Sequence, residues 1–304
     1  MNFSVIIPLY NRELYVAQAI ESALAQELAP HQIIVVDDGS TDRSVEVVEQ
    51  FGDRVEIYCQ PNRGCAAARN LGIEHATGDY LAFLDSDDFW YPWTLKLVAD
   101  AIRTHGQPPL IATAMHPFVG EAPSSIVPVK PDIKVFTDIS ASRRSVATCV
   151  LIVRRDLAEH VGGFVPINMN GTDLEFNLRV FNQGPLVVFD APPMLAYRKH
   201  QSNVTNSAAG TVRGIEYMIL QEKAGAYPGG KTWRARRRAF ITAMARSNSL
   251  NALQTGEPEL AWRLYSQTFL WNLTQGRVKY LLGYWVKRVA HCRFKQRNKR
   301  PPSS

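Results

Sequence analysis

The chain has 304 residues, of which 46% are hydrophobic and 20% are charged. This composition is typical of a globular protein and excludes a wholly disordered chain, while the length suits one large α/β domain with an appendage. Residues 1–230 contain 18 Lys and Arg against 26 Asp and Glu, whereas residues 231–304 contain 16 against 2, a net charge of +14. A basic end on an acidic body indicates an anionic surface as partner.

Hydrophobic runs and helical periodicities alternate along the first part of the chain. Strands are predicted at residues 3–8, 32–36, 55–59 and 80–84, and helices at 14–24, 45–51 and 64–76. This alternation predicts an α/β fold with a mostly parallel sheet and helices on both faces. Ligands of such sheets bind at the carboxyl ends of the strands. Polar residues follow three of these predicted strands, namely Tyr10 and Asn11, Asp37 and Asp38, and Asp85 and Asp87.

The second part of the chain is less regular. Residues 108–131 are rich in proline and predict a loop with one strand. Further strands are expected at 146–153, 186–190 and 194–198, and a helix at 172–182. No internal repeat is found in the sequence.

The cysteines and the apolar segments indicate the cellular compartment of the protein. The N-terminal run lacks the basic leader of a signal peptide, and the longest span candidate, residues 278–290, contains three basic residues. The cysteines show no zinc spacing and are too few for a disulfide scaffold, which fits a reducing cytosol. They are Cys59, Cys65, Cys149 and Cys292. We therefore expect a cytoplasmic protein whose contact with a membrane, if any, is peripheral.

The strongest single feature is Asp85-Ser86-Asp87 at the end of a predicted strand. Carboxylates on alternate residues of an extended chain point the same way, so both can bind one hard cation. Mg²⁺ or Mn²⁺ at this place would neutralise the charge on a departing diphosphate. An isolated motif of this kind is more often a solvated acidic turn, so the surrounding sequence has to decide.

Four segments around these strand ends resemble the core blocks of family-2 glycosyltransferases. They are Val5-Ile-Ile-Pro-Leu-Tyr-Asn11, residues 33–42, residues 62–72 and residues 76–88. The blocks stand in the family's order, and the resemblance extends over residues 3–205. It implies the GT-A fold, with a nucleotide-binding half at about 1–115 and an acceptor half at about 116–230. Residues 231–304 lie outside it and predict a basic helical tail.

The resemblance also implies which residues bind the nucleotide-sugar. These are Pro8, Tyr10, Asn11, Asp38, Arg63, Arg69, Asp85 and Arg198. Pro8, Tyr10 and Asn11 would line the base and ribose, and Asp38 would hydrogen-bond the base. Asp85 would lie on the ribose side, with Arg63 or Arg69 near the nucleotide. Two structural alternatives stay open: Tyr10 and Asn11 could cap the following helix, and Arg69 could pair with Asp79 on the surface.

A later block, Gly162-Gly163-Phe164 followed by Gly171-Thr172-Asp173, resembles the family's Glu-Asp motif with its trailing Arg179. Asp173 falls on the catalytic Asp, although Thr172 stands where the family usually has Glu. An inverting transfer needs one carboxylate to take the proton of the acceptor hydroxyl, and we expect Asp173 to do so. The alternatives are that Asp173 is a first-turn helix acid and that Glu175 is merely exposed.

Tyr197-Arg198-Lys199-His200 resembles the segment that closes the family's domain. A guanidinium such as that of Arg198 can hold a diphosphate through two bonds, and a neutral His can complete a metal site. The predicted ligands of Mn²⁺ or Mg²⁺ are therefore Asp85, Asp87 and His200. A surface position for His200 is the alternative.

The tail has features of a membrane-surface helix. Apolar residues recur at helical spacing beside many basic ones, and such a helix can lie on anionic lipid. The apolar positions are Val278, Leu281, Leu282, Trp285 and Val289. Packing against the rest of the chain is the alternative. Nucleic acid is not expected as a partner, because the tail lacks a recognisable nucleic-acid motif.

These features predict an inverting, metal-dependent glycosyltransferase that moves a sugar from a nucleotide-sugar, with UDP as the expected carrier, to an acceptor hydroxyl. We expect a glycan or lipid-linked acceptor, as in the synthesis of cell-surface polysaccharide or glycolipid. A phosphohydrolase with Asp85 as nucleophile is one alternative, and a degenerate nucleotide-sugar-binding scaffold is another. A nicotinamide dehydrogenase is excluded, since no GxGxxG follows a predicted strand.

Overall fold

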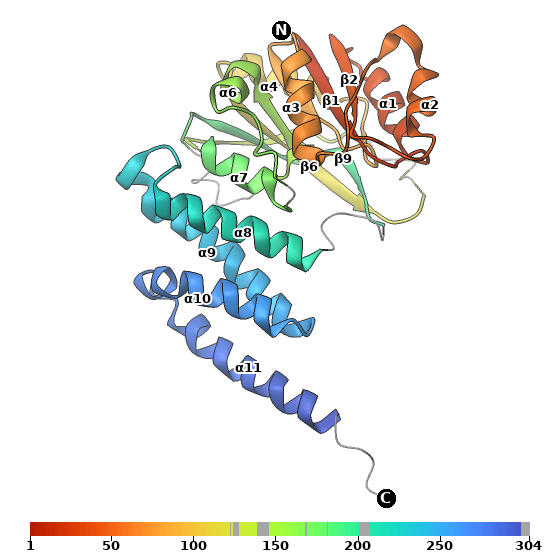
Figure 1. Ribbon diagram of the computed structural model, residues 1–304. Coiled ribbons are helices and arrows are strands. Elements are labelled where there is room, and N and C mark those ends of the chain that lie inside the picture. Colours follow the sequence, from red (N-terminus) through yellow and green to blue (C-terminus); the bar gives the residue numbers. More distant parts are fainter. Residues whose placement is uncertain are drawn as a thin grey trace, which may run out of the picture. The chain divides into compact units, whose positions relative to one another are not determined.

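The computed structural model describes residues 1–298 except 122, 124–127, 139–145, 168, 181 and 201–206 (Figure 1). The chain divides into two compact units. The first comprises residues 1–168 and 172–203, and the second residues 169–171 and 204–304. The helical unit thus begins earlier in the chain than the boundary at residue 230 that the charge distribution suggested.

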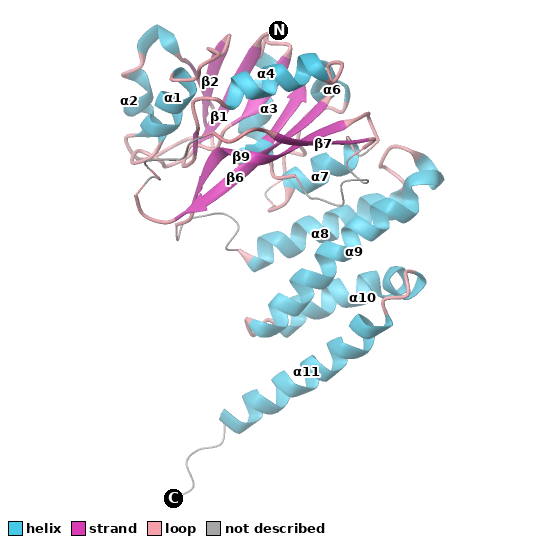
Figure 2. Cartoon of the chain, turned by 180° about the vertical axis from the view of Figure 1, so that it is seen from behind, coloured by secondary structure: helices cyan, strands magenta, loops and turns pink. Residues whose placement is uncertain are grey.

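The described part of the first unit contains a nine-stranded sheet (Figures 1 and 2). The strands run in the order β3-β2-β1-β4-β8-β6-β9-β5, and β7 pairs with β9. Their bounds are β1 Phe3–Leu9, β2 Gln32–Asp37, β3 Glu56–Cys59, β4 Tyr80–Phe83, β5 Phe89–Trp90, β6 Leu110–Phe118, β7 Asp132–Phe136, β8 Leu151–Arg154 and β9 Leu186–Arg198.

Strands β1 to β4 form the parallel half of this sheet, as the sequence predicts. All seven residues of β1 are buried, which explains its continuous apolar run. β1 pairs in parallel with β2 and with β4, and β2 pairs in parallel with β3. Because these strands run the same way, their carboxyl ends, and the polar loops that follow, meet at one edge of the sheet.

The other half of the sheet is mixed and differs in detail from the prediction. β8 pairs antiparallel with both β4 and β6, whereas β9 pairs in parallel with β6. β9 is one long strand where two short ones were expected around Pro192 and Pro193, because the register shift beside Ala114 lets the ladder with β6 continue past them. Residues 148–150 form a 3₁₀ turn, so β8 starts later than predicted.

Helices cover both faces of the sheet, as predicted. α3 lies over one face (Figure 1) and α4 over the other (Figure 2). Among the residues that the structure describes, the α-helices of this unit are α1 Val16–Leu24, α2 Ser44–Glu49, α3 Cys65–His75, α4 Thr94–Thr104, α6 Arg155–His160 and α7 Thr172–Arg179. A Cβ on Gly72 would come within 2.5 Å of the Ile6 side chain, so α3 packs directly on β1. This close packing places Arg69 and Asn70 beside the strand ends.

The second unit is helical. Its helices are α8 Ala208–Ala224, α9 Gly230–Gln254, α10 Pro258–Thr274 and α11 Val278–Asn298. Leu281 and Tyr284 of α11 are buried against Leu253 and Tyr265, and the Tyr284 and Tyr265 rings stack at 4.0 Å. The expectation that Leu281 faces lipid is therefore wrong, because it belongs to the core of this unit. Within the described ranges, none of the helices combines the length and the hydrophobicity of a membrane span.

A buried ion pair joins α8 to α9. The Arg237 Nε donates to Glu222 Oε2 at 2.6 Å, and the two residues are 1% and 2% exposed. Arg237 also donates to the carbonyl oxygens of Pro228 and Gly230, at 2.6 and 3.0 Å. A charged pair out of water needs such additional bonds, so Arg237 is a structural residue rather than part of a basic surface.

Candidate active site

The loop after β1 is joined to the loop after β2. Asn11, whose φ is +50°, accepts a hydrogen bond from the Thr41 amide at 2.8 Å, and its own amide donates to Ser40 Oγ at 2.9 Å. The suggested helix-capping role is not seen, because α1 starts without a side-chain cap. Pro8 is buried within β1, whereas Tyr10 is 44% exposed at the sheet edge. Asn11 thus shapes the edge where the nucleotide is expected.

Asp38 holds a third loop. The residue is 2% exposed, and its carboxylate accepts from Gln60 Nε2 at 2.6 Å and from the amides of Arg63 and Gly64, both at 2.8 Å. These three bonds fix residues 60–64 against the end of β2. Contact of Asp38 with the base and of the Arg63 side chain with the nucleotide stay predictions. The contact of Gln60 with Asp38 was not predicted from the sequence, because no local pattern links the two residues.

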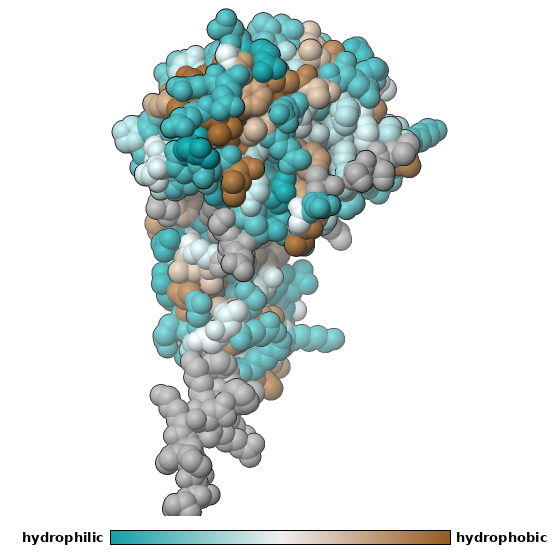
Figure 3. Space-filling model, turned by 90° about the vertical axis from the view of Figure 1, so that its right-hand side faces the viewer, coloured by the Kyte–Doolittle hydropathy of each residue, from teal (hydrophilic) through white to brown (hydrophobic). Residues whose placement is uncertain are grey.

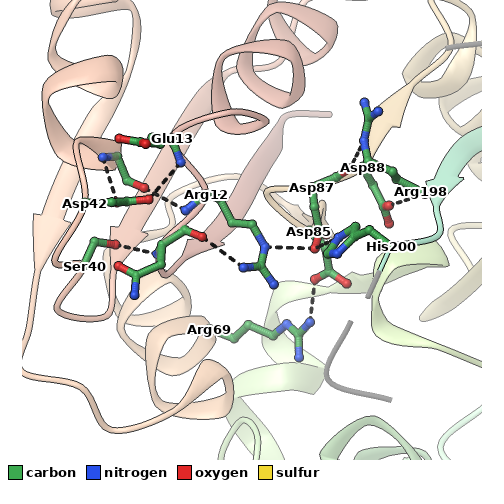
Figure 4. Close-up of polar contacts among 12 residues, drawn as sticks. Arg12, Glu13, Ser40, Asp42, Arg69, Asp85, Asp87, Asp88, Arg198 and His200 are labelled. Carbon is green, nitrogen blue, oxygen red and sulfur yellow. Dashed lines mark hydrogen bonds and ion pairs between the residues drawn. The ribbon is translucent and has the colours of Figure 1, made fainter. Parts of the chain in front are cut away.

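Residues 85–88 form a turn, and the expectation that Asp85 and Asp87 lie on an extended chain is wrong. The Asp88 amide donates to the Asp85 carbonyl at 3.0 Å and closes the turn. Asp85 Oδ1 accepts from Arg69, whereas Asp87 Oδ2 contacts Arg12 and His200 (Figure 4). The two carboxylates are thus bound by different partners. A shared metal remains a prediction.

Arg69 reaches the site from α3. Its Nη2 donates to Asp85 Oδ1 at 2.6 Å, and its guanidinium lies over the Phe164 ring, 5.6 Å from the centroid. Arg69 is 7% exposed. The alternative, in which Arg69 pairs with Asp79 on the surface, is wrong. Asp79 instead accepts from the Asn2 amide. Arg69 therefore holds the Asp85 side chain at the end of β4.

Asp87 and His200 fit a site for a hard divalent cation. The Asp87 Oδ2 and His200 Nε2 atoms lie 2.9 Å apart, and the Tyr15 ring stacks on the imidazole at 5.4 Å. Neighbouring ligands of octahedral Mg²⁺, each bound at about 2.1 Å, lie about 3 Å apart. The His200 side chain is 13% exposed, so it is not the surface residue that the alternative assumed.

A second group of ligand atoms lies nearby. Among the described residues, Asp85, Asp88 and Cys149 bring one atom each within 4.8 Å of one another. Burial, with a contribution from the charge of Asp85, raises the pKa of Asp88 to about 9, and burial also raises the pKa of the Cys149 thiol. A thiol is a poor ligand for Mg²⁺ or Mn²⁺, which prefer oxygen ligands. The three predicted ligands Asp85, Asp87 and His200 stay a prediction, and the ligand atoms of Asp87 and His200 are the two that lie 2.9 Å apart.

Arg198 ties the acidic turn to β9. Its amide donates to Asp88 Oδ1 at 2.8 Å, and its Nε donates to the Asp87 carbonyl at 3.0 Å (Figure 4). The guanidinium lies over the rings of Tyr15 and Phe118, 4.9 and 4.7 Å from their centroids. Its observed contacts position the turn, and its predicted contact with a diphosphate stays a prediction.

Asp173 is the second residue of α7 and lines a cavity of about 430 Å³. The cavity is formed by β6, β9, α7 and the segment before β8. Its walls comprise Ala112, Thr113, Ala114, Met115, Val146, Ala147, Val150, Asp173, Leu174, Val188, Phe189 and Asp190. Burial, with the charge of Asp85 adding to it, raises the pKa of Asp173. A carboxylate with a raised pKa beside a cavity is suited to accept a proton.

Glu175 has a different environment from Asp173. It is 2% exposed, and both of its oxygens accept from Arg179 Nε, at 2.9 and 3.0 Å. Arg179 also donates to the Val161 carbonyl at 2.7 Å. The suggestion that Glu175 is merely exposed is wrong, because it forms a buried ion pair. This pair fixes α7 and leaves Asp173 as the carboxylate of this helix at the cavity.

Asn70 clamps the turn ahead of α7, a contact that the sequence reasoning missed. Its Nδ2 donates to the Phe164 carbonyl at 2.8 Å, and its Oδ1 accepts from the Phe164 amide at 2.7 Å. Gly163 has φ +65°, and a Cβ there would come within 2.4 Å of Asn70 Oδ1. The paired glycines were the available signal, since they indicate a turn that requires close approach.

Comparison with known proteins decides the class of this site. The model of the glycosyl transferase family 2 matches residues 4–123, which contain the loops after β1, β2 and β4. Residues 4–123 form a family-2 glycosyltransferase domain. The predicted family and the enzyme class are thereby confirmed.

Relatives of this chain come from several bacteria. An uncharacterized glycosyltransferase of Rickettsia typhi is 29% identical over 219 residues, which cover 70% of this chain and 69% of the relative. An uncharacterized glycosyltransferase of Haemophilus influenzae is 50% identical over 90 residues, 28% of this chain and 36% of the relative. Escherichia coli YibD is 46% identical over 92 residues, 29% and 27% of the two chains. The last two similarities thus cover about a third of each relative or less.

Solved structures show the same fold. S. aureus TarS 1–349 in complex with UDP superposes with a TM-score of 0.70, over 96% of this chain and 92% of that TarS 1–349 chain, at 19% identity. The match to the longer TarS structure covers 54% of that chain. The same protein in complex with UDP-GlcNAc gives a TM-score of 0.62. These similarities confirm the predicted GT-A fold.

Proposed function

We propose that this glycosyltransferase uses a divalent metal to move a sugar from a UDP-sugar to an acceptor hydroxyl, with inversion at the anomeric carbon. The observation that supports it most is the Asp87–His200 pair, 2.9 Å apart, at the strand ends that also hold Asp85. The UDP and UDP-GlcNAc complexes of TarS support a UDP-linked donor, as do the family's loops after β1 and β2.

Each residue has a role in this mechanism. Asp87 and His200 would hold Mn²⁺ or Mg²⁺, which neutralises charge on the departing diphosphate. Asp173 takes the proton of the acceptor hydroxyl while the acceptor oxygen bonds to the anomeric carbon and the bond to the diphosphate oxygen breaks. Arg69 and Arg198 keep the acidic turn in place through Asp85 and the Asp87 carbonyl. The cavity beside Asp173 would receive the acceptor.

The acceptor is a glycan or a lipid-linked sugar in this proposal, and the phosphohydrolase alternative is disfavoured. Asp85 would have to be a nucleophile in that alternative, but its Oδ1 accepts a bond from the buried Arg69 at 2.6 Å. A carboxylate held in this way is a weaker nucleophile. The ion pair instead suits a residue that positions a ligand.

Asp87→Asn should weaken UDP binding in the presence of Mn²⁺ by at least about 10-fold and abolish its dependence on the metal. Loss of a charged metal ligand should lower metal affinity more than loss of a residue that only hydrogen-bonds a ligand. The latter typically lowers metal affinity 10- to 100-fold. Calorimetry of UDP with and without Mn²⁺ measures this. Asp79→Asn is the matched control, because Asp79 is 58% exposed and lies at the amino end of β4. Unchanged affinity and metal dependence in Asp87→Asn would refute the site.

We further propose that α11 attaches the protein to an anionic membrane surface. Five apolar residues of α11 are 46–71% exposed and lie along one side of the helix, with Lys279 and Lys287 exposed beside them. They are Val278, Leu282, Trp285, Val286 and Val289. The face drawn in Figure 3 is mostly hydrophilic, with separate hydrophobic patches. Apolar residues with basic neighbours fit an anionic lipid surface, which is also where a lipid-linked acceptor would be found.

Leu282→Ser with Val286→Ser should reduce flotation with anionic vesicles severalfold, because both side chains are well exposed and their loss leaves the core intact. Removal of residues 231–304 is unsuitable, since it would leave Glu222 buried without Arg237. The matched control is Leu220→Ser on α8, where Leu220 is 61% exposed. Binding should also weaken with salt, because it is partly electrostatic. Equal flotation of all variants, or no preference for anionic over neutral vesicles, would contradict the attachment.

A further inference from the structure

Arg12 lies in the loop between β1 and α1 and contacts the carboxylate expected to bind the cation. Its Nε donates to Asp87 Oδ2 at 3.0 Å, and this same oxygen lies 2.9 Å from His200 Nε2 (Figure 4). The side chains of Arg12 and Asp87 are 17% and 14% exposed, so water screens this contact only in part. The pair is therefore a strong local interaction within the site.

The position of Arg12 is set by the backbone around it. Its amide donates to Ser44 Oγ at 2.8 Å, and its carbonyl accepts from the Val16 amide at 3.0 Å. Its side chain folds back, and Nη1 donates to the Asn11 carbonyl at 3.0 Å. These bonds tie Arg12 to the loops that shape the nucleotide edge. The guanidinium is thus held at Asp87 and beside the expected place of the donor.

This arrangement has an electrostatic consequence. Asp87 has Arg12 as a positive partner, and Asp85 has Arg69 at 2.6 Å. A divalent cation that approaches these two carboxylates therefore also meets two guanidinium groups, which oppose it by charge repulsion. A diphosphate is attracted by the guanidinium groups and by the cation alike.

We propose, on the basis of the function proposed above, that Arg12 makes the metal and the donor diphosphate bind together. The guanidinium opposes a divalent cation at Asp87 while the donor is absent, and attracts the diphosphate when the donor arrives. Binding of the two ligands is then coupled, and each raises the affinity for the other by the same factor. Arg12 is a positioning residue for the diphosphate in this proposal and takes no part in proton transfer.

Arg12→Met tests the proposal by binding alone. Mn²⁺ without nucleotide should bind Arg12→Met roughly 10-fold more tightly than the unaltered protein, as counted by electron paramagnetic resonance of free Mn²⁺. UDP in saturating Mn²⁺ should bind it roughly 10-fold more weakly, as measured by calorimetry. Arg12→Lys keeps the positive charge, so its affinity for Mn²⁺ without nucleotide should be close to that of the unaltered protein. Arg43→Met is the matched control, because Arg43 is 76% exposed and pairs with Glu13 in the neighbouring turn.

The sign of the change for Mn²⁺ alone decides the question. If Arg12 only holds the Asp87 side chain in place, its loss should weaken binding of Mn²⁺, and that result or an unchanged affinity would overturn the proposal. An Arg43→Met effect equal to that of Arg12→Met would overturn it as well, since general surface charge would then explain both. Failure of the unaltered protein to bind UDP with Mn²⁺ would refute the proposed function together with this inference, and so differs from a failure confined to the variant.

Discussion

Asp173→Asn should lower kcat by roughly 10²- to 10⁴-fold while donor affinity stays nearly unchanged, because the substitution keeps the shape of the side chain and removes its basicity. The structure strengthens the choice of Asp173 over Glu175, whose carboxylate is buried in a pair with Arg179. Single-turnover measurements with saturating donor give the chemical step, and calorimetry of UDP gives the affinity.

The matched control for Asp173→Asn is Asp190→Asn. Asp190 lines the same cavity and forms an ion pair with Lys134, so we expect its substitution to cost less than about 10-fold. Near-normal turnover of Asp173→Asn, or an equal loss in both variants, would remove Asp173 from the role of base.

The pH dependence gives a second measurement for the same residue. A general base must be ionised, so activity is present above the pKa of Asp173 and is lost as the pH falls through it. Burial raises this pKa, and the acidic limb of kcat/KM should therefore lie above about pH 3.9, the ordinary value for Asp.

Arg237→Met should destabilise the helical unit by about 3–5 kcal/mol, because it leaves the Glu222 carboxylate buried with its main partner removed. Arg238, whose Nε lies 3.6 Å from Glu222 Oε1, can offset part of this loss. Hydrogen exchange of the α8 and α9 amides measures the change within this unit, where a global unfolding curve would mix the two units.

A surface ion pair in the same unit is the control. Arg263→Met removes the partner of Glu216, and because Arg263 is 50% exposed we expect a loss of only about 0–1 kcal/mol. Arg237→Met combined with Glu222→Met should recover much of the stability, since no charge is then buried alone. Equal protection of the amides in Arg237→Met and Arg263→Met would show that the buried pair contributes little.

The parallel half of the sheet could be predicted well because its signals are local. The fully buried run of β1 and the periodicity of α1 are visible within a few residues. The extent of β9 was harder to predict, because Pro192 and Pro193 indicate the end of a strand. Only the pairing with β6 keeps this strand continuous. The second half of the sheet depends on such distant pairings, and no short window of sequence contains them.

The same distinction applies to the site. The acidic turn could be recognised by the type and spacing of its residues, and Asp173 was predicted from the resemblance of its segment to the family's motif. Arg12 and Asn70 were not, because their partners Asp87 and Phe164 lie 75 and 94 residues further on. In α11, apolar residues occupy several sides of the helix, so spacing alone could not show that Leu281 is buried while Leu282 is exposed.

Helix α3 gives the two sides of the site a common mechanical support. Its adjacent residues Arg69 and Asn70 contact the turn at Asp85 and the turn at Gly163–Phe164, which leads to the helix of Asp173. A displacement of this helix therefore shifts both turns at once. Anyone who grafts the acceptor side of a relative onto this chain, to change its specificity, should exchange residues 65–75 and 162–179 as one module.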